Sequence, residues 1–390
     1  MLAQMVFEVA IVGGGIIGVV VAMGLAKRGV TAVIYEQSRS FREIGAGVAF
    51  TANAMKRMDL IDPKIVDAVN LVAKPNGDPD NSNDYVQWLD GVHYDAESPA
   101  ATEGKLLFKL YTGYKGFQGC HRAHLLDELI KVIEPGMVRF GKRVEMYNNR
   151  GAGERLQLNF QDGSTAEADA SIACDGIKSR VRHIILGESN PASYPHFNRK
   201  VAYRGLIPME KAEPVLGRCK DRNQHMHTGP AAHLLHFCDV DGAKPMTAPA
   251  TREEVVDAFA SWGPTVRSIT EMLPDKLEKW AIFDTYDYPA STYVAGRVCL
   301  ASDAAHASAS HHGAGAGIGV EDALALCTLL EKLLKTPWGS TAARAKAVEE
   351  AFIIYNDVRR ERIQWLVNSS RNVCDIYEWI YPETGTDWGK

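Results

Sequence analysis

The segment from Phe7 to Gly29, FEVAIVGGGIIGVVVAMGLAKRG, constrains the fold more than any other part of the chain. A short β-branched run leads into Gly13-x-Gly15-x-x-Gly18, and an apolar helical stretch follows and stops at Gly29. A second β-rich run, TAVIYEQ, begins at Thr31. Parallel strands need such a helical crossover, and its right-handedness places both strand ends at one edge of a sheet. The sequence therefore predicts an α/β fold that begins with a βαβ unit.

The same segment predicts a dinucleotide site. The first glycine allows a tight turn, the second lets the backbone approach a pyrophosphate, and the third lets helix and strand pack closely. The helix N-terminus adds amide hydrogens and a positive dipole end. Glu36 ends the second strand, where it can accept hydrogen bonds from a ribose. The alternative interpretation is a glycine-rich turn that binds no nucleotide. The pattern alone does not distinguish NAD from FAD.

Composition excludes several other classes of protein. The 390 residues carry a formal charge of -5, with no long basic run, which gives no electrostatic footprint for nucleic acid. Seven scattered cysteines without a C-x-x-C pair favour neither a disulfide framework nor a zinc knuckle, so we expect a reducing, cytoplasmic location. The apolar run after Val6 imitates a membrane span, but its glycines and the missing basic flank argue against one.

A second glycine cluster lies between Cys299 and Ala323, CLASDAAHASASHHGAGAGIGVEDA. Three interpretations compete for it. His306, His311 and His312 are candidate metal ligands, but Asp303 is the one clear acidic partner. A Ser/His/Asp nucleophile is disfavoured because no G-x-S-x-G elbow is present. Small residues before a long helix also suit a cradle for a flat ligand, because they leave room and expose backbone amides.

Several motifs resemble the class A flavoprotein monooxygenases, which use FAD and a nicotinamide cofactor. RVCLASDAAH with GAGAGIGVEDA resembles their second flavin motif, HRAHLLDEL their flavin-contacting helix, and CDGIKSRVR their DG motif. EIGAGVAFTANA, from Glu43, is similar to their loop along the flavin. AYRGLI, FDTYDYPA and HHGAGAGIGVEDA are closest to fungal enzymes that hydroxylate and dearomatise resorcinol-type polyketides in tropolone, azaphilone and sorbicillinoid pathways. Salicylate hydroxylase resembles the chain more distantly.

The resemblance implies non-covalent FAD, transient NADPH as co-substrate and no metal. It also implies that Asp303 hydrogen-bonds the ribityl chain or a water linked to the pyrophosphate, and that Arg122 reaches the flavin. The FAD-binding residues expected from the two glycine motifs and the resemblance are Gly13, Gly15, Gly18, Glu36, Arg42, Gly47, Arg122, Asp175, Asp303, Gly313, Gly315 and Ala316.

The implied reaction is hydroxylation of an aromatic substrate with O2 and NADPH through a flavin C4a-hydroperoxide. Arg204 matches the arginine that anchors the substrate in the dearomatising enzymes, where it would favour a phenolate; a structural ion pair is the alternative role. Phe237 stands where those enzymes pair the arginine with a tyrosine. A decarboxylating salicylate-type hydroxylase and a flavin-binding protein with impaired turnover are the alternative functions.

The chain departs from the family pattern in further places. Ser302 replaces the glycine of GDAAH, and Ser310 replaces a proline before the histidines. After HLLHF the chain passes directly to CDVDGAKPMTAP, where the family continues through a longer strand pair. The two serines put flavin affinity or coupling efficiency in doubt, but not the fold. The shorter segment predicts either a trimmed sheet or missing residues.

We expect a Rossmann-like FAD-binding domain with an inserted mixed β-sheet domain and a C-terminal helix. The FAD-binding domain covers residues 1–180, with a strand-loop excursion at 74–115. The substrate-binding sheet covers 181–290, the chain returns to the FAD-binding domain over 291–335, and a helical segment at 336–390 ends it. Small aromatic substrate, O2 and NADPH are the expected partners, and a homodimer stays open.

Overall fold

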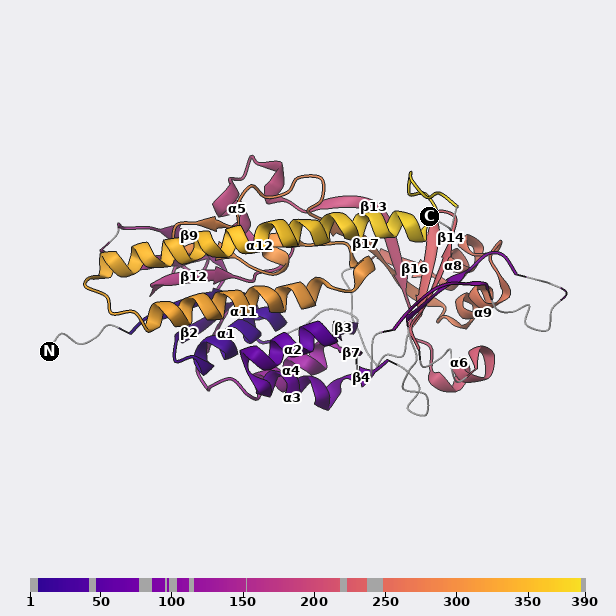
Figure 1. The fold of residues 1–390 in the computed structure, drawn as a ribbon, viewed down its shortest axis with the longest axis horizontal. Helices are drawn as coiled ribbons and strands as arrows, with labels where there is room; N and C mark the ends of the chain where they lie inside the picture. The colour runs from indigo at the N-terminus through magenta and orange to yellow at the C-terminus, as the bar shows by residue number, and fades with distance from the viewer. Residues whose placement is uncertain are drawn as a thin grey trace.

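The computed structural model describes residues 6–41, 47–76, 86–94, 97, 104–111, 116–151, 153–217, 223–236 and 248–386. Figure 1 shows an elongated molecule with a helix-covered sheet at one end and a second group of strands at the other. Helix α12 (Thr341–Tyr377) runs along one side from the first part to the second. The candidate functional site lies where these two parts meet.

A six-stranded sheet forms the first part, in the order β18-β19-β12-β1-β2-β8. Every neighbouring pair is parallel except the edge pair β18 and β19. The central strand β1 is flanked by β12 and β2, so Val9 lies opposite both Ala170 and Ala32. The strands are β1 (Glu8–Val12), β2 (Thr31–Glu36), β8 (Val138–Phe140), β12 (Ala170–Ala173), β18 (Val294–Ala295) and β19 (Val298–Leu300). The expected α/β fold is confirmed.

Helix α1 (Ile16–Lys27) crosses from β1 to β2 as the sequence predicts. Its first ten residues are all buried, because the sheet, α11 (Gly315–Leu334) and α2 (Ala52–Ile61) surround it. A Cβ added at Gly24 would lie 2.6 Å from both Cys327 and Ile61, so glycine permits this close packing. Among the described residues, no helix is long and apolar enough to cross a membrane.

Two sheets make up the second part of the molecule. One has the order β13-β17-β16 and the other β15-β14-β5-β6. Strands β5 and β6 come from the excursion at 74–115, and β5 pairs parallel to β14, so the excursion is joined to the inserted segment. The strands are β5 (Val86–Asp90), β6 (Leu106–Leu110), β13 (His196–Arg204), β14 (His225–Gly229), β15 (Ala232–His236), β16 (Ala248–Thr251) and β17 (Lys276–Asp284).

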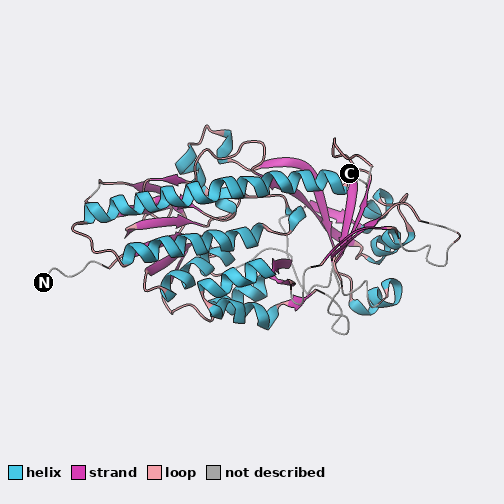
Figure 2. Cartoon of the chain, viewed as in Figure 1, coloured by secondary structure: helices cyan, strands magenta, loops and turns pink. Residues whose placement is uncertain are grey.

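Figure 2 shows how short helices and small sheets complete both parts. Strands β10 and β11 form an antiparallel hairpin across the turn that contains Asp162 and Gly163. The remaining strands are β3 (Gly47–Thr51), β4 (Lys74–Pro75), β7 (Phe117–His121), β9 (Val144–Asn148), β10 (Leu156–Phe160) and β11 (Thr165–Ala168). The remaining helices are α3 (Pro63–Val72), α4 (Arg122–Ile130), α5 (Arg180–Leu186), η1 (Pro191–Ser193), α6 (Met209–Leu216), α8 (Arg252–Ala258), α9 (Pro264–Met272), α10 (Asp303–His306) and η2 (Ser310–His312).

The third glycine of the fingerprint generates a test of this packing. A Cβ at Gly18 would lie 2.1 Å from the carbonyl oxygen of Gly13, a backbone atom that cannot swing aside. Alanine is the better helix former by about 1 kcal/mol, so propensity and packing oppose each other at this position. We expect packing to dominate, and Gly18→Ala to lower the free energy of unfolding by about 1–3 kcal/mol in urea titrations.

The matched control is Gly153→Ala, where an added Cβ meets nothing within 4 Å and the backbone φ is not positive. Its unfolding midpoint should match that of the unaltered chain. If Gly18→Ala also leaves the midpoint in place, close helix–strand contact does not explain this glycine.

Candidate flavin site

The loops that follow four strands of the central sheet converge at one edge. Strands β1, β2, β12 and β19 are mutually parallel, so their carboxyl ends share that edge. Gly13 follows β1, Glu36 ends β2, Asp175 follows β12 shortly after Ala173, and Asp303 follows β19. The structure therefore brings together residues that lie almost three hundred positions apart in the sequence.

The glycine turn after β1 has the geometry that the fingerprint predicts. Gly13 adopts φ +103°, and a Cβ there would lie 2.4 Å from the carbonyl oxygen of Cys174. The backbone N–H of Gly14 donates to Glu36 Oε2 at 2.7 Å, and that of Ser38 donates to Oε1 at 2.8 Å. Glu36 thus fixes the turn, while its ribose contact stays a prediction.

Two helix N-termini at this edge fit the phosphate and ring system of FAD. Helix α1 begins after Gly15 and α11 begins after Ala314, and neither has a side-chain cap. Their first amide hydrogens point away from the helix without a side-chain partner, as an anion-binding terminus requires. Gly313 adopts φ +61° with nothing within 4 Å of an added Cβ, and Gly315 would meet Ser308 Oγ at 3.7 Å. Gly315 and Ala316 open α11, so the cradle is uncrowded.

The turn between β19 and Asp303 is strained. Ser302 has φ 57° and ψ −148°, a region that is essentially restricted to glycine. Its backbone N–H donates to Asp322 Oδ2 at 3.0 Å, which holds the residue in this conformation. Asp303 then opens the four-residue helix α10, half-buried at the sheet edge.

The three histidines of the motif go to three different places. His306 is buried, with Nε2 2.6 Å from Asp322 Oδ2. His312 Nε2 lies 2.7 Å from Ser369 Oγ on α12. The ring of His311 packs against that of His233, with centroids 5.2 Å apart. The set of metal ligands considered from the sequence is therefore not assembled by the fold.

Asp322 is a functional-site residue that sequence reasoning missed. It is fully buried and accepts from His306 and Ser302 at Oδ2 and from Arg359 Nε at Oδ1, the last at 2.9 Å. Burial raises its pKa, but His306 and Arg359 outweigh burial and the pKa is lowered. Helical spacing offered a signal, because Asp322 lies on the buried stripe between Ile318 and Leu326.

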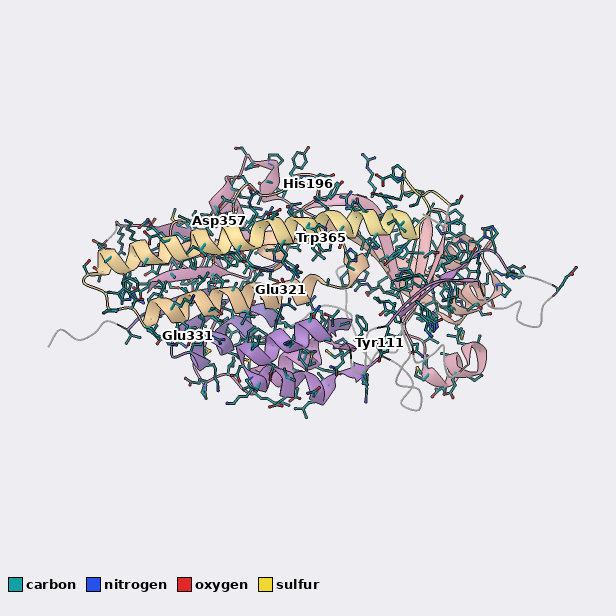
Figure 3. All side chains as sticks on the ribbon, viewed as in Figure 1. Tyr111, His196, Glu321, Glu331, Asp357 and Trp365 are labelled. Atoms are coloured by element: carbon teal, nitrogen blue, oxygen red, sulfur yellow. The ribbon has the colours of Figure 1, made fainter. Side chains whose placement is uncertain are left out.

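Glu321 flanks Asp322 on α11 and faces α12 (Figure 3). It accepts from Arg359 Nη1 at 2.7 Å and from Arg362 at 2.7 and 2.8 Å. The adjacent carboxylates thus anchor the start of α11 to the middle of α12.

Asp175 and Arg182 form hydrogen bonds that stabilise the loops at the carboxyl edge of the central sheet. Asp175 Oδ1 accepts from Ser179 Oγ and Oδ2 from the Val181 N–H, and burial raises the pKa of its carboxyl. The fully buried Arg182 donates to the carbonyls of Ala304 and Ala305, directly after Asp303. These contacts give the DG motif a structural role, and its flavin contact stays a prediction.

Arg122 lies near Arg204, which belongs to the strands of the second part. Gly47 on β3 pairs with His121 on β7, and Arg122 follows as the first residue of α4. Arg204 ends β13 with its guanidinium 4.7 Å from the Trp280 ring centroid. The pKa of Arg204 is lowered, first by desolvation and then by the charge of Arg122, although water reaches the side chain. Among the described residues, Arg204 pairs with no carboxylate.

Two predicted site residues, Arg42 and Phe237, lie outside the described residues. Ser310 is described and opens the turn η2 directly before His311. Arg359 was also missed, because its contact with Asp322 joins two distant helices and no local pattern marks it, whereas Arg182 lies in the DG-like segment that the sequence singles out.

Comparisons with known proteins agree with this geometry. A family model described as "FAD binding domain" matches residues 6–193 and 222–356. The chain is 47% identical to an FAD-dependent monooxygenase, pigN, of Monascus ruber, covering 98% of this chain and 90% of that protein. It is 43% identical to a salicylate hydroxylase, asL1, of Sarocladium schorii, covering 98% and 84%. A solved salicylate hydroxylase substrate complex matches with TM-score 0.83 and 29% identity, covering 99% and 92%.

The strain at Ser302 yields a stability prediction. A residue held in this region costs about 1–3 kcal/mol, whereas glycine adds about 0.4–1 kcal/mol of entropy to the unfolded chain. We expect Ser302→Gly to raise the free energy of unfolding by about 1 kcal/mol, measured by urea titration of the FAD-loaded protein. Ser302→Ala retains the Cβ and is the matched control. Equal midpoints for the two variants would contradict the assignment of strain to the Cβ.

Proposed function

Because the chain belongs to the FAD binding domain family and is an FAD-dependent monooxygenase, we propose that it hydroxylates a resorcinol-type phenol with loss of ring aromaticity. The proposal adds NADPH as the electron source and O2 as the oxygen source. One oxygen atom forms the new carbon–oxygen bond, and the other leaves as water. The substrate is expected to bind between the flavin edge and the strands of the second part.

The observation that carries the proposal is the position of Arg204. Its guanidinium is reachable by water, lies beside a second cation and pairs with no described carboxylate. Two neighbouring cations repel each other, so an anionic group between or beside them would be stabilised. A phenolate meets that requirement, and ionising the phenol makes its ring more electron-rich. Arg204 would therefore both orient the substrate and favour its reactive form.

The residues of the sheet edge would hold FAD. The turn from Gly13 to Gly15 and the start of α1 would bind the pyrophosphate, and Glu36 the adenosine ribose. Asp303 and the start of α11 would contact the ribityl chain and the ring. When bound, FAD supplies the transfer of electrons to O2. The chain contains a single dinucleotide fingerprint, so NADPH would bind only transiently.

A salicylate-type decarboxylating hydroxylation is the second candidate. It is favoured by the names of asL1 and of the solved salicylate hydroxylase complex. In that reaction Arg204 would bind the substrate carboxylate. A third possibility, flavin binding with impaired turnover, is motivated by Ser302, Ser310 and Phe237.

A panel of aromatic compounds separates these candidates. We expect resorcinol aldehydes to accelerate NADPH oxidation by the purified yellow protein and to give oxygenated products detected by mass spectrometry. Salicylate is the comparison compound. Release of CO2 with salicylate, without turnover of the aldehydes, would support the second candidate. FAD binding without acceleration by any phenol would support the third.

Substitutions of Arg204 test its contact with the substrate. Arg204→Lys keeps the charge but loses the planar fork, and a charge-assisted hydrogen bond contributes about 1.5–3 kcal/mol. We expect kcat/KM for the accepted phenol to fall roughly ten- to a hundred-fold, with unchanged FAD content. Arg204→Ala should lower it further and raise the pH at which the bound phenol ionises, because the favourable positive charge is gone.

Arg267→Ala is the control, since Arg267 is exposed on α9 and is likewise in the inserted segment. The decisive measurement is the absorbance of the bound phenolate against pH. Coincident titration curves for the unaltered chain and Arg204→Ala, with activity retained, would show that Arg204 does not contact the phenol.

A further inference from the structure

We propose that His233, His311 and Cys374 form a zinc-binding site, with Glu378 as the fourth ligand, where three elements of the fold meet. His233 lies on β15, His311 on the turn η2, and Cys374 near the end of α12. The sequence analysis expects no metal and considers His311 only together with His306 and His312, so it does not identify this set of residues. The inference is independent of the substrate proposed above.

The ligand atoms are already gathered. One donor atom from each of His233, His311 and Cys374 lies within 4.8 Å of the other two. In a tetrahedral zinc site, ligand atoms stand roughly 3.5 Å apart, given zinc–sulfur and zinc–nitrogen bonds of about 2.3 and 2.0 Å. Closing the site around these three ligands would therefore require their more distant atoms to approach one another by roughly 1 Å.

Glu378 already contacts two of the three ligands. Its Oε1 lies 3.4 Å from His233 Nδ1 and accepts from Cys374 Sγ at 3.3 Å. Its other oxygen, Oε2, accepts from Lys200 Nζ. One oxygen of the carboxylate is therefore directed into the cluster while the other holds the neighbouring ammonium group.

One buried imidazole nitrogen of the cluster lacks a polar partner. Among the described residues, Nε2 of His311 has no hydrogen-bond partner and is not accessible to water, while Nδ1 of His233 has only the 3.4 Å contact with Glu378. A buried polar atom without a partner is costly, and coordination would satisfy it.

The charge balance of the cluster also favours a cation. Glu378 and Asp375 are acidic, and Lys200 lies near both, 3.8 Å from Asp375 Oδ1. Lys200 contributes one positive charge and the two carboxylates contribute two negative charges. The cluster therefore carries a net negative charge even while the Cys374 thiol is protonated. On binding zinc, Cys374 would lose its thiol proton to solvent and its hydrogen bond to Glu378, and the sulfur–zinc bond would replace both.

Zinc and nitrogen–sulfur ligands suit each other. Mixed imidazole, thiolate and carboxylate sets are typical of zinc, whereas magnesium and calcium prefer oxygen ligands. The burial of Cys374, 1% exposed, and of the Glu378 side chain, 6% exposed, would keep competing water out. The bound ion would fasten the turn η2 to β15 and to the end of α12.

Zinc content tests the proposal directly. The full-length, FAD-loaded protein, free of any histidine tag, is treated with a chelator, incubated with zinc chloride and passed through gel filtration. Elemental analysis should then give one zinc ion per FAD, and zinc should raise the melting temperature. Absence of stoichiometric zinc in the unaltered chain would overturn the proposal whatever the variants do.

Variants locate the ion. Cys374→Ser and His311→Gln should each weaken zinc binding at least roughly 100-fold, because outer-shell partners alone contribute 10- to 100-fold. His312→Gln is the matched control, since His312 shares the turn but bonds Ser369 instead, and it should keep the zinc. Unaltered zinc affinity in Cys374→Ser or His311→Gln would overturn the site.

X-ray absorption of the zinc-loaded, unaltered chain provides a readout that does not depend on how the variants fold. One sulfur neighbour with nitrogen and oxygen neighbours is expected. A zinc ion without a sulfur neighbour would place the metal elsewhere and exclude Cys374 as a ligand.

Discussion

The carboxylate of Asp322 holds three separate segments in one arrangement. It accepts hydrogen bonds from the Ser302 backbone and from Arg359, and it lies against the buried ring of His306. Ser302 and His306 bracket Asp303, Asp322 belongs to α11, and Arg359 belongs to α12. Because the carboxylate is fully buried, it stays ionised only while these partners surround it. The position of the loop after β19 therefore depends on both long helices.

This dependence explains how the chain tolerates Ser302 where the resembling enzymes have glycine. The strained backbone is stabilised by the hydrogen bond to Asp322 on one side, and Arg182 holds the next carbonyls at Ala304 and Ala305 on the other. Buried ion pairs are not in general more stabilising than apolar packing, but removing one partner leaves an uncompensated charge.

The sequence predicted what contiguous residues determine. The run from β1 through α1 to β2 was evident because strand, glycine turn, helix and acidic residue follow one another, and Glu36 ends β2 as expected. Contacts between distant segments were not evident. The pairing of β5 with β14 joins the excursion to the inserted segment, and nothing in residues 86–90 marks that partner. A C-terminal helical segment was expected over 336–390, and the helix within it begins at Thr341, where Ser340 caps it in a pattern that sequence can reveal.

Helix α12 links the flavin edge to the substrate strands through a series of ion pairs. Its 37 residues span about 55 Å at 1.5 Å per residue. Arg344 pairs with Asp169 beside the central sheet, Arg359 with Asp322 at the flavin loop, and Arg371 with the buried Asp284 at the end of β17. Strand β17 pairs with β13, which ends at Arg204. Since a helix of this length is stiff between its contacts, the separation of Asp303 from Arg204 is set by residue spacing along α12. In the proposed reaction, a substrate bound by Arg204 would therefore lie at a fixed distance from the flavin edge, although Arg204 and Asp303 belong to different parts of the molecule.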